Sequence, residues 1–237
     1  LLEVANQVLP VLSQAEKTLA AYREGRSGIL RIGVECYPCF EWLTGVIGQF
    51  MLAMPDIDVD IVQKFQFTGL EGLLNHHIDV LITPDFVKKE KIIYETLTEY
   101  QLVILVSGDH PMAEVSHLTP EQLSRETLLT FPVSMERLDI LTYFLTPAHL
   151  KPEKLKQIES LEIMLQMTAL KRGVCVLPEW LADLKNKDHK LRKIRIGKKG
   201  LLQKLFLAMR EPDKTIPYIE KFIAIGREKA NNTSVTR

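Results

Sequence analysis

The sequence predicts an α/β protein with a mainly parallel sheet, preceded by a separate helix. From residue 29 onward, short apolar segments that suit strands alternate with amphipathic segments that suit helices. Alternation of this kind requires right-handed crossover connections and therefore favours a parallel sheet. In addition, four of the apolar segments end in the same way, with a proline: Pro38, Pro84, Pro132 and Pro178.

Residues 1–26 are expected to form a linker helix that mediates dimerisation. Apolar residues recur at alternating steps of four and three, the heptad rhythm of a coiled coil: Leu1, Ala5, Val8, Leu12, Ala15, Leu19 and Tyr22. Pro10 lacks a backbone donor and is expected to kink this helix. The alternative is a terminal helix packed on its own domain, but the apolar seam is narrow and a polar run separates it from the first expected strand.

The first half continues with short strands and two helices. Strands are expected at 29–34, 59–62, 80–82 and 102–106, where apolar residues dominate. A shorter helix is expected at 68–76. A longer helix is expected at 39–54, because one face of it collects Phe40, Leu43, Ile47, Phe50 and Met51.

The second half repeats this alternation. Strands are expected at 128–131, 174–177, 191–196 and 201–209. Helices are expected at 137–145, 161–171, 180–185 and 217–229. Gly173 lies just beyond the second of these helices, where a glycine ends a helix without steric cost.

The four prolines indicate where a ligand is expected to bind. A proline just past a strand's carboxyl end stops the ladder and suits the first turn of a following helix. In open α/β sheets, ligands bind at this edge, where helix N-termini offer unpaired N–H groups to anions. Two prolines lie in each half, so two such edges facing each other would form a cleft. A single proline of this kind would indicate no more than the start of a loop.

Composition excludes several classes of function. Thirty basic residues balance thirty acidic ones, so a domain-wide nucleic-acid surface is not expected. The sequence has no apolar run of membrane-spanning length and no recognisable signal peptide. Three cysteines in a chain of 237 residues do not make a disulfide framework, so a reducing cytoplasm is expected. The chain starts without methionine, and we expect a fragment.

Enzyme motifs are missing from the sequence. There is no G-x-S-x-G, no H-E-x-x-H and no phosphate-binding loop. An enzyme hypothesis would rest on the segment CYPC (36–39) alone. We therefore expect no catalytic residues, no metal and no cofactor.

Several segments are similar to those of a known family: LRIGVE (30–35), GLLNHHIDVLIT (72–83), LVILVSGDHPMA (102–113), TPEQLSRETLLTF (119–131) and VCVLPEW (174–180). With the leading helix, they resemble the effector-binding portion of LysR-type transcriptional regulators. Two further segments indicate a subgroup within this family: IGVECYPCFEWLT (32–44) and SRETLLTFPVSMERLDI (124–140). They are similar to those of members that control methionine-biosynthesis genes and respond to homocysteine.

The resemblance implies two Rossmann-like α/β lobes, as in type 2 periplasmic binding proteins, with the effector in the cleft between them. Lobe I would comprise 29–106 and 201–230, and lobe II would comprise 107–200. The family also has a winged helix-turn-helix ahead of the linker helix. That domain is absent from this chain, so promoter DNA is expected to be bound only through it. A homodimer or homotetramer is expected, with no membrane partner.

The segment CYPC allows three interpretations from the residues, and the resemblance adds a fourth. Cys36 and Cys39 have the spacing of a redox pair at a strand–helix junction, where the helix dipole lowers a thiol pKa. They would supply half of a zinc site, with His76 or His77 as further ligands. They would pack as two small apolar residues. Given the resemblance, they would also line the pocket and contact the effector sulfur, or form a reversible mixed disulfide with it.

An α-amino acid effector needs a partner for each of its charges. Helix N-termini near Pro38 or Ser134, with Arg137 as a bidentate donor, suit its carboxylate. Asp85 or Glu35 suits its ammonium, although Glu35 would alternatively pair with Arg31. Its side chain would pack against Phe40, Phe67 and Met135. The expected ligand-binding set is Glu35, Cys36, Tyr37, Cys39, Phe67, Thr83, Asp85, Pro132, Ser134 and Arg137.

Two other functions remain as alternatives. One is a thiol-redox or metal-responsive protein that uses Cys36 and Cys39. The other is a solute-binding protein of the same fold, which would be exported. The heptad seam favours a dimeric DNA-binding regulator, because a solute receptor has no need of one.

Overall fold

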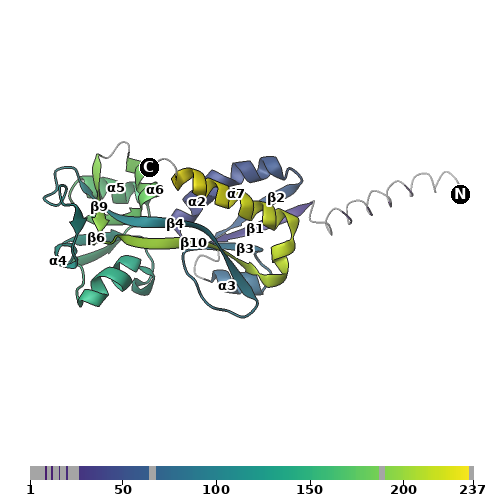
Figure 1. Ribbon diagram of the computed structural model, residues 1–237, viewed down its shortest axis with the longest axis horizontal. Coiled ribbons are helices and arrows are strands. Elements are labelled where there is room, and N and C mark those ends of the chain that lie inside the picture. Colours follow the sequence, from purple (N-terminus) through teal and green to yellow (C-terminus); the bar gives the residue numbers. More distant parts are fainter. Residues whose placement is uncertain are drawn as a thin grey trace. The chain divides into compact units, whose positions relative to one another are not determined.

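The computed structural model describes residues 27–63, 68–186 and 190–234, together with the separate positions Leu9, Leu12, Glu16 and Ala20. These residues divide into two compact units. Unit 1 combines the chain up to Glu99 with the chain from Lys204, and unit 2 holds Tyr100–Gln203 (Figure 1). The linker helix predicted at 1–26 lies outside the described residues apart from those four positions, so its heptad seam stays a prediction.

Unit 1 is built on strands in the order β2-β1-β3-β10. β1 (Gly28–Val34) lies parallel to β2 (Ile57–Val62) and to β3 (Val80–Thr83). β10 (Leu201–Arg210) runs antiparallel to β3 and sets Phe206 opposite Thr83. The chain passes between the units through β10 and through β4 (Ile92–Ser107).

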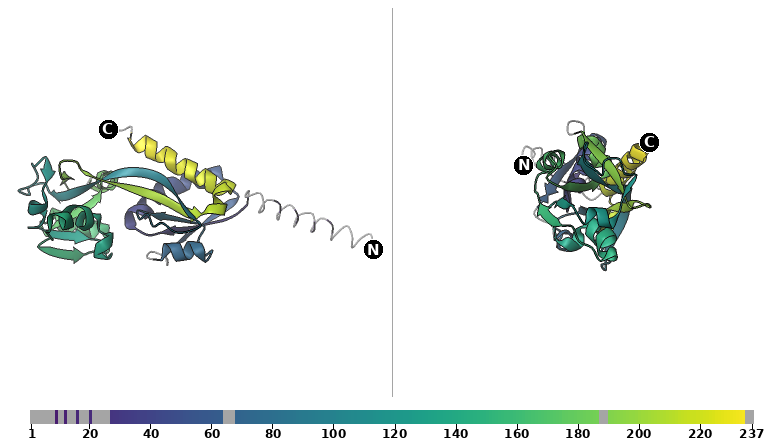
Figure 2. Two further views of the ribbon diagram at one scale, coloured as in Figure 1. Left: turned by 60° about the horizontal axis from the view of Figure 1, so that its bottom comes forward. Right: turned by 90° about the vertical axis from the view of Figure 1, so that its left-hand side faces the viewer.

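Helices cover both faces of the unit 1 sheet (Figures 1 and 2). α2 (Tyr37–Ala53) and α7 (Pro217–Ser234) pack together on one face, and α3 (Gly69–Leu74) lies on the other. The Phe222 ring of α7 meets Phe50 and Trp42 edge-on, with ring centroids 5.4 and 6.5 Å apart. Gly226 permits this close approach, because a Cβ atom there would lie 2.9 Å from the Trp42 ring.

Unit 2 has the strand order β4-β8-β6-β7. β6 (Thr127–Thr130) lies parallel to β7 (Lys154–Gln157) and β8 (Val174–Pro178), and β8 is antiparallel to β4. β9 (Leu191–Ile196) also pairs with β4, and β5 (His117–Leu118) pairs with β9. The helices are α4 (Pro120–Leu123), α5 (Leu161–Ala169) and α6 (Glu179–Lys185). The core is apolar and includes Ile104, Val106, Leu118, Leu128, Ile140 and Leu145.

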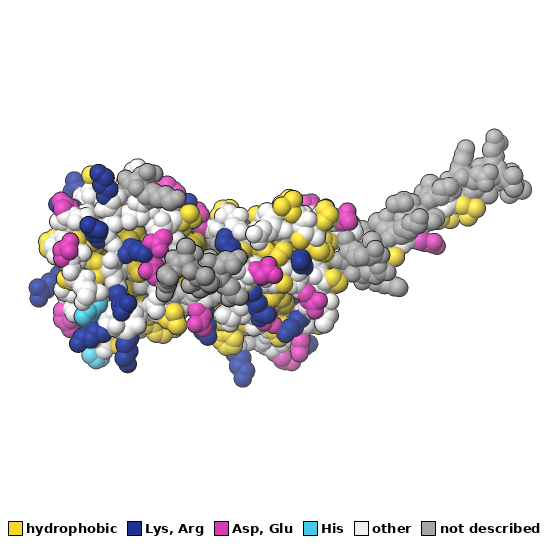
Figure 3. All heavy atoms as spheres, turned by 45° about the horizontal axis from the view of Figure 1, so that its top comes forward, with side chains coloured by type: hydrophobic (Ala, Val, Ile, Leu, Met, Phe, Trp, Pro, Cys, Tyr) yellow, Lys and Arg dark blue, Asp and Glu magenta, His cyan; other side chains and the backbone are white. Residues whose placement is uncertain are grey.

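The prediction of a mainly parallel α/β protein is confirmed. Each of the four prolines lies at or just beyond the carboxyl end of a strand: Pro38 after β1, Pro84 after β3, Pro132 after β6 and Pro178 at the end of β8. Among the described residues, no helix combines the length and the apolarity that crossing a membrane requires. On the face drawn in Figure 3, basic and acidic side chains of the described residues are interspersed over each unit.

Four elements differ from the sequence prediction. β4 is 16 residues long and begins at Ile92, ten residues before the predicted strand at 102–106. The helix predicted at 137–145 is wrong: a 3₁₀ turn, η2 (Met135–Arg137), is followed by a π-helical turn, η3 (Ile140–Leu145), and a second 3₁₀ turn, η4 (Thr146–Ala148). β7 and β5 were not expected from the sequence. Both are short, and β7 is a mostly exposed strand that joins a sheet only through tertiary pairing.

Replacing Phe222 with alanine is expected to destabilise the protein by about 3 to 5 kcal/mol, because its ring is 0% exposed and fills the space between α2 and α7. Leu52 is a matched control, since it is also an apolar residue of a unit 1 helix but is 85% exposed. Leu52→Ala is expected to change stability by less than about 0.5 kcal/mol. Urea unfolding measures both values, and similar losses for the two variants would contradict this packing.

Candidate functional site

The segment CYPC forms the junction between β1 and α2 in unit 1. Cys36 is the N-cap of α2, with an extended backbone (φ −144°, ψ 157°), and its Sγ accepts a hydrogen bond from the Cys39 N–H at 3.0 Å. Pro38 occupies the first turn, where a missing N–H costs no helical bond. The first turn, all of which is described, holds no acidic side chain. Sulfur thus serves here as the capping acceptor that an oxygen usually provides.

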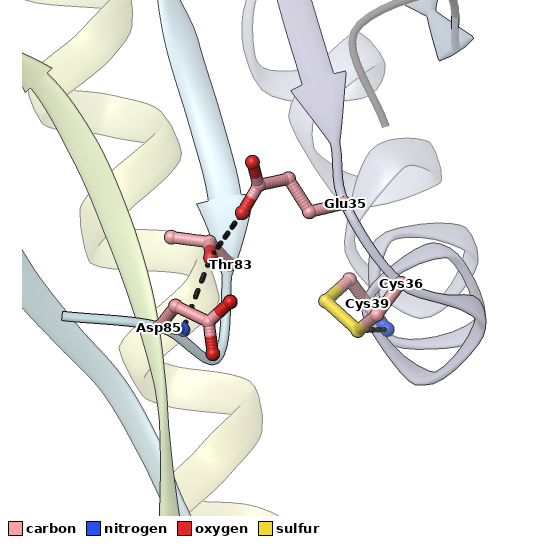
Figure 4. The surroundings of a disulfide bond; sticks show 5 residues. All are labelled: Glu35, Cys36, Cys39, Thr83 and Asp85. Atoms are coloured by element: carbon pink, nitrogen blue, oxygen red, sulfur yellow. Dashed lines mark hydrogen bonds between the residues drawn. A yellow bond between two sulfur atoms is a disulfide. The ribbon is translucent and has the colours of Figure 1, made fainter. Parts of the chain in front are cut away.

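A disulfide joins Cys36 and Cys39, with an Sγ–Sγ distance of 2.03 Å (Figure 4). The two cysteines differ in exposure, because Cys39 is 0% exposed whereas Cys36 is partly exposed. The bond rules out the interpretation as two separately packed thiols. Within the described residues, no group of three or more His, Cys, Asp or Glu side chains is arranged to hold a metal ion.

Glu35 connects the ends of three elements of unit 1. This residue is 8% exposed, and its Oε2 accepts a hydrogen bond from the Thr83 hydroxyl at 2.6 Å, while its Oε1 accepts one from the Gly69 N–H at 3.3 Å. A Cβ atom on Gly69 would lie 2.8 Å from Oε1. The carboxylate therefore links the end of β1 to the end of β3 and the start of α3, and each of its oxygens has a protein donor.

Arg31, the alternative partner expected for Glu35, contacts Asp79. The Arg31 guanidinium instead lies 3.9 Å from Asp79, and the Arg31 N–H donates to the same carboxylate at 2.9 Å. Asp79 also accepts from the buried Arg210 at 3.3 Å. Arg31 thus belongs to a separate charged group and has no role beside the disulfide.

Thr83 and Asp85 continue this edge at the end of β3. The Thr83 hydroxyl, which is buried, accepts a hydrogen bond from the Asp85 N–H at 3.0 Å while donating to Glu35 (Figure 4). Burial raises the pKa of the Tyr94 hydroxyl, and the negative charges of Glu35 and Asp85 raise it further. The two carboxylates therefore produce a negative potential at this edge, which suits a cationic group.

Three aromatic rings beside this edge were not expected from the sequence. The Phe86 ring lies 4.8 Å from Tyr94 and 5.9 Å from Phe206, centroid to centroid, and Phe206 is the strand partner of Thr83. The Tyr94 hydroxyl donates to the Val87 carbonyl at 2.9 Å and so holds the turn that carries Phe86. Phe86 remains 62% exposed. Its place directly after Pro84 and Asp85 was the signal in the sequence.

In unit 2, Pro132 and Ser134 follow β6 and are exposed, and Arg137 is half-buried. Ser134 precedes the three-residue 3₁₀ turn η2, so the α-helix N-terminus expected there is absent. At the end of β6, the buried Thr130 hydroxyl has no hydrogen-bond partner among the described residues. Nothing in the sequence distinguishes Thr130 from an ordinary strand residue.

The structure brings part of the expected ligand set together. Six of its residues lie at the carboxyl edge of unit 1: Glu35, Cys36, Tyr37, Cys39, Thr83 and Asp85. The Tyr37 hydroxyl donates to Glu41 at 2.8 Å, one turn along α2. Phe67 lies outside the described residues. Pro132, Ser134 and Arg137 belong to unit 2, so an effector pocket that uses both units stays a prediction.

Known proteins resemble this chain over most of its length. The family model described as the LysR substrate binding domain matches residues 23–231. The HTH-type transcriptional regulator MetR of Escherichia coli strain K12 is 33% identical over 230 residues, which cover 97% of this chain and 71% of that protein.

Solved structures support the same relationship. The regulatory domain of MetR, a LysR family regulator from N. meningitidis, is 33% identical, with a TM-score of 0.79 over 87% of this chain and 95% of that one. A mutant of that domain, in which two cysteines three positions apart are changed to serine, has a TM-score of 0.78 and 32% identity over 87% of this chain and 95% of that one.

Replacing Thr83 with valine is expected to destabilise the protein by about 1 to 3 kcal/mol, because the buried Glu35 carboxylate loses its shortest hydrogen bond. Thr98→Val is the control, since the Thr98 hydroxyl donates only to a neighbouring exposed carbonyl of the same strand. The free energy of unfolding of Thr98→Val is expected to differ from that of the unaltered protein by less than about 0.5 kcal/mol. Chemical denaturation measures the difference, and equal stabilities for the two variants would show that Glu35 does not depend on Thr83.

The native chain is expected to show no thiol that reacts at neutral pH. Cys36 and Cys39 are bonded, and burial raises the pKa of the Cys175 thiol to about 12, despite a hydrogen bond with Thr168 that lowers it. Unfolding is expected to release a single reactive thiol, that of Cys175. A colorimetric thiol titration with and without denaturant tests this. Rapid labelling of the folded chain at Cys175 would contradict the burial.

Proposed function

The chain belongs to the family of LysR substrate-binding domains, and we propose that it senses homocysteine for a regulator of methionine-biosynthesis genes. The curated relatives are transcriptional regulators and not enzymes, so the chain is a regulatory domain rather than a catalyst. Its fold is that of LysR effector-binding domains, with α/β units like those of type 2 periplasmic binding proteins.

The observation that carries this proposal is the meeting of sulfur and carboxylates at one edge of unit 1 (Figure 4). An amino acid with a sulfur side chain carries a cationic ammonium and a polarisable sulfur atom. Asp85 and the Cys36–Cys39 disulfide offer complementary groups for these two features. Phe86 and its neighbouring rings supply apolar surface for the methylene groups between them.

We assign the ammonium to Asp85 rather than to Glu35. Both Glu35 oxygens accept hydrogen bonds within unit 1, from Thr83 and Gly69, and little of the residue is exposed. Asp85 is less buried and lies at the turn after β3. A carboxylate that is partly reachable from solvent recruits a ligand cation at lower desolvation cost than a buried one.

We assign the effector carboxylate to Arg137 of unit 2. The α2 N-terminus provides few backbone N–H donors for this carboxylate. Pro38 has no N–H, the Cys39 N–H donates to Cys36 Sγ, and the Phe40 N–H donates to the Cys36 carbonyl. A guanidinium binds a carboxylate through two parallel hydrogen bonds. With groups from both units, the effector would act through its differential affinity for two arrangements of the units or of the dimer.

The remaining parts of the proposal concern the whole regulator. A winged helix-turn-helix outside this sequence would bind promoter DNA, and the linker helix would pair two chains into a homodimer or, with further contacts, a homotetramer. The protein would work in the cytoplasm, where both promoter DNA and the amino-acid pool are found. A metal or cofactor has no part in this scheme.

Calorimetric titration with L-homocysteine, with methionine and homoserine as controls, tests the proposed effector. We expect selective binding of homocysteine with a free energy of roughly −4 to −8 kcal/mol, which corresponds to millimolar to micromolar dissociation constants. Asp85→Asn is expected to weaken binding about tenfold or more, because it removes the ammonium partner. Asp60→Asn, which changes an exposed carboxylate on β2, is expected to have no effect.

The absence of heat with all three compounds would reject homocysteine as the effector while leaving the family assignment intact. Equal affinity for homocysteine and homoserine would show that the sulfur is not recognised. Unchanged affinity in Asp85→Asn would remove Asp85 from the site.

A further inference from the structure

The two cysteines of the Cys36–Cys39 disulfide differ in exposure. Cys39 is the third residue of α2 and is completely buried, whereas Cys36 caps the helix and is partly exposed. A thiolate that attacks a disulfide must approach one sulfur along the S–S axis and expel the other. Access therefore makes Cys36 Sγ the atom attacked and Cys39 Sγ the leaving group.

The position of Cys39 favours its departure. It lies in the first turn of a 17-residue helix, where the backbone N–H groups and the helix dipole stabilise negative charge. Burial acts in the opposite direction, because an apolar environment raises a thiol pKa, so a thiolate formed at Cys39 would soon take up a proton.

The neighbouring charges select among thiols. Glu35 and Asp85 place negative charge at the same edge as the disulfide (Figure 4). The ammonium group of an aminothiol can pair with this negative charge, whereas a thiol that lacks a cationic group gains no such contact and a thiol with further negative groups is repelled.

We propose that the Cys36–Cys39 disulfide is a thiol-exchange site that captures small aminothiols covalently. The thiolate of the ligand attacks Cys36 Sγ, the Cys36–Cys39 bond breaks, and Cys39 leaves as a thiolate that takes up a proton. The products are a mixed disulfide between the ligand and Cys36 and a free thiol at Cys39. The exchange needs no other oxidant, because the protein disulfide is reduced as the mixed disulfide forms.

The reaction is reversible, since Cys39 lies beside the mixed disulfide and expels the ligand by attacking Cys36 Sγ again. This site rests on the proposed function, because homocysteine is an aminothiol that the same edge would recognise. In a reducing cytoplasm, protein disulfides are mostly transient and take part in catalysis or sensing, which fits an exchange site and not a structural bond. Opening the bond would release the first turn of α2, while Trp42, Leu43 and Val46 keep the rest of the helix in the core.

Incubation of the oxidised chain with L-homocysteine, followed by acid quenching, alkylation and mass spectrometry, tests the exchange. We expect one homocysteine per chain, attached to Cys36, and an alkylated Cys39. Methionine is expected to give no adduct, because it has no thiol. Absence of an adduct, or its attachment to Cys39 or Cys175, would overturn the proposal.

The rate of adduct formation tests the selection of aminothiols. At equal thiolate concentration, homocysteine is expected to react about tenfold or more faster than 2-mercaptoethanol. Asp85→Asn is expected to slow the reaction with homocysteine but not that with 2-mercaptoethanol, which has no ammonium group. Equal rates for the two thiols in the unaltered chain would overturn selection by charge.

Two single variants test the asymmetry without relying on the intact disulfide. Cys39→Ser leaves the accessible Cys36, which is expected to form an adduct with homocystine, the oxidised ligand. Cys36→Ser retains a good N-cap and leaves the buried Cys39, which is expected not to react. Circular dichroism checks that both variants fold, and equal reactivity of the two would overturn the assignment of Cys36 as the attacked sulfur.

A double variant, Cys36→Ser with Cys39→Ser, separates this proposal from the proposed function. Calorimetric binding of homocysteine to the double variant, together with no adduct in the unaltered chain, would overturn the exchange and keep homocysteine as the effector. Neither binding nor adduct would overturn both. Selective adduct formation in the unaltered chain, with weaker binding to the double variant, would support both.

Discussion

The buried carboxylate of Glu35 holds the carboxyl edge of unit 1 together. The carboxylate accepts hydrogen bonds from Thr83 at the end of β3 and from Gly69 at the start of α3. In the chain, Glu35 lies between the end of β1 and Cys36. A buried charge is tolerated only where donors replace the lost water, so these bonds fix the relative positions of three chain segments. Asp85, Phe86 and Cys36 all extend from segments that this group anchors. The geometry of the candidate site therefore depends on a residue that we do not expect to touch the effector.

Much of the fold was predictable because its signals are local. Strand–helix alternation indicated the class, and the four prolines marked strand ends correctly because proline disrupts a ladder wherever it occurs. The early part of β4 was missed, since most of its residues are half-buried without a regular alternation, and only pairing with distant strands makes them a strand. The helix at 137–145 was wrong for a related reason. Packing of Ile140, Leu141 and Leu145 into the core imposes tighter and wider turns than the apolar pattern suggested.

The candidate site was predictable only in part. Residues that directly follow predicted strands, such as Glu35 and Asp85, were found because topology places strand ends together. Tyr94 and Phe206 were missed because they lie within strands, far apart in the sequence, and meet only because β4 and β10 are neighbours in the sheet. The sequence left the state of Cys36 and Cys39 open, because identical spacing serves metal binding, packing and redox chemistry. Their one-sided burial, which distinguishes these uses, is a tertiary property.

The division of the chain into units has a consequence for the order in which the protein folds. Unit 2 is continuous in sequence and has all of its strands once the ribosome has synthesised Gln203. Unit 1 is split, and α7, which supplies the Phe222 ring between Phe50 and Trp42, follows unit 2 in the chain. Contacts between residues so distant in sequence form slowly, since a long loop must first be closed. The nascent strands β1, β2 and β3 must therefore remain without this covering helix until α7 has been synthesised, a period in which exposed apolar surface attracts chaperones.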